Sequence, residues 1–419
     1  MKPDAPHKGS LLVVFLTVFI DLLGFGMVLP LLPIYAKQFG VDEHGIALGL
    51  LMASFSAMQF LFAPLWGRLS DRVGRRPVMM VGLAGSTAFY ALFGVATARQ
   101  SLFWLFVARI GAGIAGATIS TAQAYIADST TLETRAKGMA LIGAAFGLGF
   151  TFGPLLCAAA LVFSHDVAIS PMPGYTASAL SCIALALAVF KLPESLRPGA
   201  DSAVRGFFDS ASLRDALTTP SIGMLLLTSF VSIVSFGSFE TTISLLLKNE
   251  EGAFRYEPFE IVLFFAYIGL VLSLAQGLVV RRLAGRLTEP VMANAGAIVS
   301  ILGFVLLVMA SGAGSLSFLM LAAATDVIGF AFITPSLNSL ISRRSNPEKQ
   351  GGILGVTQSV GSLARIVCPM ITMPLFAISP TLPYWAAVVL MFVGLGLLTL
   401  AARGGKDYAA PGTNSPGAS

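Results

Sequence analysis

Five ionisable side chains lie inside long apolar stretches of the sequence, where such groups are rare. They are Asp21, Arg109, Glu240, Asp326 and Arg365. A charged residue at the centre of a membrane helix costs about 2.5–3.5 kcal/mol on insertion scales, so it normally faces a water-filled cavity or an oppositely charged partner. The chemistry open to these residue types is proton binding and release, ion pairing and the binding of polar groups. We therefore treat all five as candidates for proton coupling or substrate binding.

The acids near the start of each half are the first candidates for proton binding. Asp21 lies near the middle of the first apolar stretch, and Glu240 lies deep in a later one. A carboxyl group in a low-dielectric environment favours its neutral form, so it can gain and lose a proton near neutral pH. Glu240 is our first choice for a titrating carboxyl that faces substrate. Two alternatives stay open: Asp21 is a structural acid fixed by an arginine or by helix contacts, or Glu240 lies nearer the outer rim.

The two arginines need partners. Asp326 and Arg365 lie on neighbouring late stretches, and we expect a structural ion pair between them. Arg109 begins a glycine-rich face that extends to Gly116, and such glycines indicate close helix packing. The guanidinium of Arg109 requires an acid or carbonyl groups, and Asp21 is one possible partner. Further polar side chains at membrane depth could line a cavity or join helices by hydrogen bonds: Gln59, Gln123, Tyr267 and Gln276.

Composition indicates that lipid surrounds the elements that hold these residues. Hydrophobic residues make up 56% and charged residues 11% of the 419 residues, against about 25% charged in an average soluble domain. So little charge cannot coat a soluble protein of this size. The net charge of +5 does not indicate nucleic-acid binding, because the basic residues are scattered between apolar runs. The cysteines and histidines have no metal-ligand or disulfide spacing, so we expect no metal and no cofactor.

Twelve apolar stretches approach the length of about 20 residues that crosses a bilayer as a helix. They are residues 11–35, 46–66, 78–98, 102–126, 138–163, 175–190, 222–247, 261–279, 291–310, 316–341, 354–376 and 384–402. A polar linker, 192–220, divides the chain into a six-helix N-terminal bundle (1–191) and a six-helix C-terminal bundle (221–419). Within the linker, 209–217 is predicted to form a short amphipathic helix on the membrane surface. The predicted fold class is all-α integral membrane.

The distribution of Lys and Arg orients these helices. With the N-terminus in the cytoplasm, most of the loop Lys and Arg residues fall in cytoplasmic segments. The outer loops then contain only Lys37, Arg99, Lys248 and Arg255. Because basic residues concentrate on the cytoplasmic side, both termini are predicted to be cytoplasmic. The predicted location is the plasma (inner) membrane if the protein is prokaryotic. An enzyme is not expected, since no nucleophile–base set, phosphate loop or metal cluster occurs.

Several motifs resemble the major facilitator superfamily. The turn Gly67–Pro77 is similar to the signature between its helices 2 and 3. A second turn at a matching place in the other half, Arg281–Pro290, suggests two related bundles around a central site. The run Arg109–Gly116 resembles the helix 4 motif. The run Gly149–Pro154 resembles the antiporter motif of helix 5, with Cys157-Ala158 in place of its closing glycine pair.

The first half also resembles the tetracycline–proton antiporter group, through the runs Asp21–Pro30, Met58-Gln59 and Phe62–Pro64. The resemblance implies the major facilitator fold and a drug:proton antiporter that alternates access by rocking two bundles. It implies that Asp21 handles substrate or protons and that Arg109 takes part in proton coupling. It implies a conformational latch at the cytoplasmic side, formed by Gly67, Asp71, Arg72, Gly74, Arg75 and Arg76, and a helix-packing motif formed by Gly149, Gly153 and Pro154.

Two positions depart from the tetracycline antiporters. Phe89 and Ser300 stand where those proteins carry acids in helices 3 and 9. Glu240 and the run Tyr267–Gly277 resemble eukaryotic tetracycline-transporter-like proteins instead. These departures weigh against tetracycline itself as the substrate.

The sequence therefore predicts a secondary active transporter, specifically a proton-coupled efflux antiporter of an amphipathic organic compound or drug. The proton gradient would drive it, without a cofactor. The expected partners are a small-molecule substrate, protons and the lipid bilayer, with no nucleic acid, and the protein is expected to be a monomer. Two other functions stay open: a proton-coupled symporter or uniporter of a small metabolite, and a non-transporting membrane receptor or lipid-binding protein.

Overall fold

The computed structural model describes residues 8–40, 45–130, 132–164, 169–196, 214, 221–249, 252–283, 286–345 and 350–404. The described elements are all helices, which confirms the predicted all-α membrane fold. Eleven helical segments are long and apolar enough to cross a membrane. The predicted span 138–163 corresponds to helix α7 (Leu132–Val162), whose apolar part over the described residues, Gly147–Val162, is shorter. The predicted surface helix at 209–217 lies outside the described residues, apart from Arg214.

The N-terminal half consists of seven further helices: α1 (Lys8–Val28), α2 (Leu32–Gln38), α3 (Ile46–Val73), α4 (Arg75–Ala98), α5 (Leu102–Gly116), α6 (Ile119–Asp128) and α8 (Met172–Lys191). Two predicted helices are interrupted. The first breaks between α1 and α2, where Pro30 lacks a backbone N–H. The fourth breaks at Ala117 and Thr118, between α5 and α6. Within this half α1 packs on α7 and α8, while α4 packs on α5 and α8.

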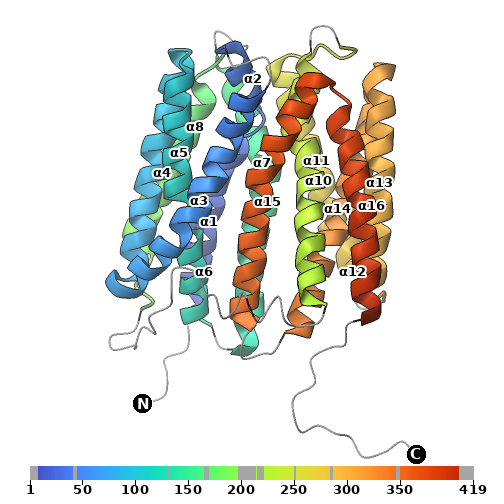
Figure 1. Cartoon of the computed structure of the whole chain (residues 1–419). Helices are drawn as coiled ribbons and strands as arrows, with labels where there is room; N and C mark the ends of the chain where they lie inside the picture. Colours follow the sequence, from blue (N-terminus) through green and yellow to red (C-terminus); the bar gives the residue numbers. More distant parts are fainter. Residues whose placement is uncertain are drawn as a thin grey trace, which may run out of the picture.

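The C-terminal half repeats this plan. It consists of α10 (Ile222–Lys248), α11 (Pro258–Leu274), a π-helical turn η1 (Ala275–Val280), α12 (Arg281–Leu283), α13 (Glu289–Ala313), α14 (Leu316–Arg344), α15 (Gln350–Ile378) and α16 (Leu382–Gly404). Helix α10 packs on α15 and α16, and α13 packs on α14 and α16. Figure 1 shows the two groups of helices standing side by side.

Two seams join the halves, one between α3 and α15 and one between α7 and α11. A Cβ atom on Gly49 would lie 2.7 Å from the carbonyl oxygen of Pro369, and one on Gly269 would lie 2.6 Å from that of Phe150. At both places the backbones approach so closely that only glycine fits. We call the end of the molecule with the α3–α4 turn at Gly74 the motif end, and the opposite end the far end. Helices α3 and α15 meet toward the far end and diverge toward the motif end (Figure 1).

Candidate functional site

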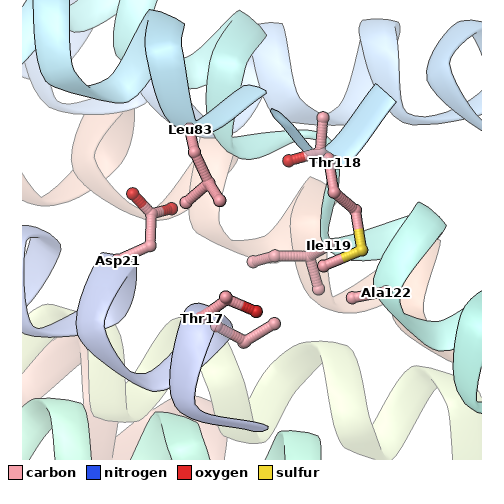
Figure 2. Close-up of a pocket in the computed structure, with 8 residues that line it drawn as sticks. Thr17, Asp21, Leu83, Thr118, Ile119 and Ala122 are labelled. Atoms are coloured by element: carbon pink, nitrogen blue, oxygen red, sulfur yellow. The ribbon is translucent and has the colours of Figure 1, made fainter. Parts of the chain in front are cut away.

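Asp21 lies half-buried on α1 with its carboxyl group inside the N-terminal half. Its Oδ1 accepts a hydrogen bond of 3.1 Å from Ser181 of α8, and Ser86 of α4 provides a second polar contact. Asp21 also lines a cavity of about 20 Å³ together with Thr17 and Thr118 (Figure 2), which is room for about one water molecule. The carboxyl therefore has neutral polar partners and space for a water on its motif-end side.

The break between α5 and α6 forms one wall of this cavity. Thr118 hydrogen bonds to the carbonyl of Ala115 through its own hydroxyl, at 3.0 Å. The side chain of Gln59 donates to the carbonyl of Gly116 from α3, at 3.2 Å. Backbone groups freed by a break at membrane depth must be satisfied by neighbouring side chains. Gln59, predicted to line a cavity or join helices, joins α3 to the end of α5.

Arg109 is 3% exposed and lies on α5. Its guanidinium stands over the ring of Phe55 at 4.6 Å and over that of Phe25 at 5.9 Å, which are favourable cation–π distances. The possible pairing with Asp21 is not seen, and within the described part of the chain the Nε and Nη1 atoms of Arg109 have no hydrogen-bond partner. The reason is that the guanidinium of Arg109 lies level with Phe25 of α1 and not with Asp21. Phe25, one turn beyond Asp21, holds the position that faces the guanidinium.

Tyr90 connects these two charged residues, and no sequence pattern singled it out. Its buried ring on α4 packs against Gly24 of α1. The charges of Asp21 and Arg109 both act on its hydroxyl group. Asp21, Tyr90 and Arg109 therefore form one polar group inside the N-terminal half. A single tyrosine near the middle of the predicted span 78–98 is a weak signal, because isolated buried tyrosines are common.

Glu240 and Arg365 form the corresponding charged group of the C-terminal half. Glu240 is half-buried on α10 and Arg365 is exposed on α15. Each charge acts on the other, although no hydrogen bond joins the two side chains in the described part of the chain. Arg365 also lines a polar cavity between α10, α14 and α15. An acid on α10 and a base on α15 thus interact electrostatically across the interface between these helices.

Asp326 differs from the prediction. It is fully buried on α14, and neither carboxyl oxygen has a hydrogen-bond partner among the described residues. The expected ion pair with Arg365 does not form. The reason is the face of α14 on which Asp326 lies. Asp326 packs against Gly303 of α13, and the backbone carbonyl of Asp326 accepts a hydrogen bond of 3.2 Å from the hydroxyl of Ser300. The acid therefore points into the bundle rather than toward α15.

The turn Gly67–Pro77 folds around Arg75, which is 7% exposed. Its guanidinium pairs with Asp71 at 2.5 Å and with Asp128 of α6 at 3.0 Å, and it donates to Ser70 at 2.7 Å. Gly74 has a φ of 107°, which favours glycine. Arg76 donates to the carbonyl of a residue on α8 at 2.6 Å. The remaining two members of the predicted latch, the half-buried Gly67 and the exposed Arg72, lie on α3.

Glu194 belongs to the same network and was missed by the sequence analysis. It follows α8 and accepts backbone hydrogen bonds from Arg75 at 2.9 Å and Arg76 at 3.1 Å. A carboxylate at a helix N-terminus satisfies free N–H groups and complements the helix dipole. The available signal was an acid directly after a predicted span, in a polar stretch otherwise rich in arginine.

The remaining candidates occupy packing or peripheral positions. Gly149 and Gly153 face α1, where a Cβ on Gly153 would lie 2.8 Å from the backbone of Gly26. Pro154 lies inside α7. Tyr267 of α11 donates to the carbonyl of Met320 at 3.1 Å. Gln123 is half-buried on α6, and Gln276 is half-buried in the π-helical turn.

The chain resembles known membrane proteins along most of its length. Residues 14–369 match the family model described as Major Facilitator Superfamily. The chain is 33% identical over 380 residues to the class C tetracycline resistance protein of Escherichia coli, covering 89% of this chain and 91% of that protein. It is 29% identical over 421 residues to multidrug resistance protein 2 of Bacillus subtilis, covering 98% and 100%. The crystal structure of the human organic anion transporter MFSD10 (TETRAN) matches with a TM-score of 0.71 and 26% identity, covering 94% and 100%.

Proposed function

Because the chain belongs to the major facilitator superfamily and is a membrane transporter rather than an enzyme, we propose that it exports an amphipathic organic compound in exchange for protons. Its relatives named for tetracycline and multidrug resistance support a substrate of this class. We also propose that the motif end faces the cytoplasm and that the protein works as a monomer in the plasma membrane.

The relationship between Glu240 and Arg365 carries the proposal. Their charges interact across the interface between α10 and α15, yet among the described contacts no hydrogen bond joins the two side chains. When Glu240 takes up a proton it loses its charge, and the attraction that holds α15 toward α10 weakens. When Glu240 releases the proton, its negative charge returns and the attraction is restored. Proton binding at Glu240 can thus bias the position of α15, which forms one of the two seams between the halves.

The N-terminal group gives the proposal a second proton-binding residue. Among the described residues, the polar partners of Asp21 are neutral and a water-sized space adjoins it, so its protonation breaks no ion pair there. Tyr90 places its hydroxyl under the influence of both Asp21 and Arg109. Each elementary charge that moves through a potential of 100 mV releases about 2.3 kcal/mol, which is enough to drive a substrate against a gradient.

The network around Arg75 is proposed to act as the latch of the motif end. In this structure Asp71 and Asp128 hold Arg75 against α6, and Glu194 holds the start of α4. If the halves rock, the contacts of the α3–α4 turn would change, because α3 packs on α15 of the other half.

Transport into inverted membrane vesicles tests the function. With an imposed pH gradient, acid inside, the wild-type protein should accumulate a fluorescent amphipathic dye, and both Asp21→Asn and Glu240→Gln should remove most of that accumulation. Glu257→Gln is the matched control, because Glu257 is an exposed acid in the far-end loop before α11. Unchanged accumulation in both variants would exclude the carboxyl mechanism. Accumulation only when the gradient is reversed would support symport instead.

A further inference from the structure

A polar cavity of about 100 Å³ lies inside the C-terminal half between α10, α14 and α15. Its buried floor contains the hydroxyl groups of Ser229 and Ser232. Its rim contains the exposed side chains of Asn338, Gln358 and Arg365. The volume exceeds what one water molecule needs several times over. The cavity therefore has room for a ligand group, and only Arg365 of its lining enters the transport mechanism above.

The lining is rich in hydrogen-bond donors and positively charged. Among the described residues that line the cavity, Arg365 is the one ionisable group. Ser232 is 3% exposed, and its Oγ has no hydrogen-bond partner among the residues that the structure describes. Leaving a buried hydroxyl unpaired is unfavourable, so a group that enters the cavity and accepts a hydrogen bond from Ser232 would be stabilised there. The amides of Asn338 and Gln358 supply further donors at the rim.

An aromatic pair separates the cavity from the acids of this half. Phe236 and Phe330 stack with their ring centroids 3.9 Å apart and their planes 7° apart. They lie one turn beyond Ser232 on α10 and one turn beyond Thr334 on α14. Glu240 and Asp326 lie one turn further along the same helices. By their positions along α10 and α14, the two rings lie between the cavity and the two carboxyl groups, and this separation weakens the repulsion between those groups and an anion in the cavity.

We propose that this cavity binds the carboxylate group of the transported compound, with Arg365 as its counter-charge and Ser232 as a buried donor. The physiological meaning of this site rests on the proposed transport function, whereas binding itself requires no gradient. Arg365 interacts with both Glu240 and the cavity, so a bound carboxylate competes with Glu240 for the same guanidinium. Removing the charge of Glu240 should therefore strengthen carboxylate binding.

Thermal-shift measurements on the detergent-solubilised full chain test the site. Benzoate, indole-3-acetate and decanoate are each compared with the corresponding primary amide, because ligands that bind the folded state raise its Tm. In the wild-type protein at least one carboxylate should raise the Tm while its amide does not. Arg365→Gln should weaken the apparent affinity by about tenfold or more, since the charge-assisted hydrogen bond to the carboxylate is lost. Arg365→Lys should retain part of it, and Glu240→Gln should increase it.

Ser359→Ala is the matched control on the same helix, because Ser359 is exposed, donates to the carbonyl of Gly355 at 3.1 Å and does not line the cavity. Equal shifts with acids and amides, no shift with any carboxylate, or full binding by Arg365→Gln would each overturn the site. Carboxylate binding without proton-driven dye transport would leave the site standing and remove the proposed function. Proton-driven dye transport without carboxylate-specific binding would support the proposed function and exclude the site.

Discussion

The carboxylate of Glu194 accepts a backbone hydrogen bond from Arg75 at 2.9 Å. This contact ties the segment after α8 to the turn between α3 and α4, two regions separated by more than a hundred residues in the chain. The side chain of the same Arg75 pairs with Asp71 and Asp128. One residue therefore links α3, α4, α6 and the start of the linker.

Loss of this cap should destabilise the motif end. We expect Glu194→Ala to lower the free energy of unfolding by about 1–2 kcal/mol, because capping residues at helix N-termini contribute about that much. The decrease should appear as a lower Tm of the purified protein in detergent. Glu257→Ala is not a suitable comparison, since Glu257 caps α11. Glu194→Gln is suitable and should recover part of the loss, because an amide oxygen still accepts. A Tm equal to wild type for Glu194→Ala would contradict the capping role.

A methyl group at Gly269 should open the seam between α7 and α11. Its Cβ would overlap the backbone at Phe150 and Thr151. It would also disturb the hydrogen bond of 2.9 Å that Thr151 donates to Gly269. We expect Gly269→Ala to widen the distance between spin labels placed at the far ends of α7 and α11, as measured by electron paramagnetic resonance.

Gly277→Ala serves as the comparison for this experiment, because among the described residues no atom beyond the neighbouring helix turns lies within 4 Å of a Cβ placed at Gly277. Its label distances should stay those of the wild type. If Gly269→Ala gives the same distances as Gly277→Ala, the seam does not hold the two halves together.

Neutralising Asp326 should have little effect on stability. Asparagine has nearly the same shape as aspartate, and the described contacts give the carboxyl no ion pair that the change would break. We expect the Tm of Asp326→Asn to stay within a few degrees of wild type. Asp128→Asn should lower the Tm more, because it weakens the pair with the buried Arg75. A large loss of stability in Asp326→Asn would indicate that Asp326 does pair with a cation.

Tyr256, in the loop before α11, should make stability pH-dependent under alkaline conditions. Partial burial and the nearby Glu260 raise the pKa of its phenol above the ordinary value of 10.0. The folded state then holds the proton more tightly than the unfolded state, so its stability contribution is complete below about pH 10 and declines as pH rises through the folded pKa. Tyr256→Phe should show a flatter decrease in Tm between about pH 9 and pH 11. An identical slope in both proteins would rule out this contribution.

The helices could be predicted because membrane spans depend on local apolar length, which the sequence displays directly. The partners of the charged residues could not. Arg109 meets Phe55 and Phe25, which come from two other helices and look like ordinary apolar residues in the sequence. The expected pair of Asp326 and Arg365 was wrong because neighbouring helices fix proximity but not the face that each side chain occupies. Tyr90 and Glu194 became visible only when α1, α4, α5 and α8 were brought together.

Glycines line the two seams where the halves meet, so the closest contacts there are made by backbone atoms rather than by side chains. A saturation mutagenesis scan of this region should therefore give a two-valued result. Positions such as Gly49 and Gly269 should accept almost no replacement, while residues a single position away should accept many. The relative motion of the two halves then depends on a few glycines, where the lack of a side chain lets the backbones touch. The surfaces around them are free to change for new substrates.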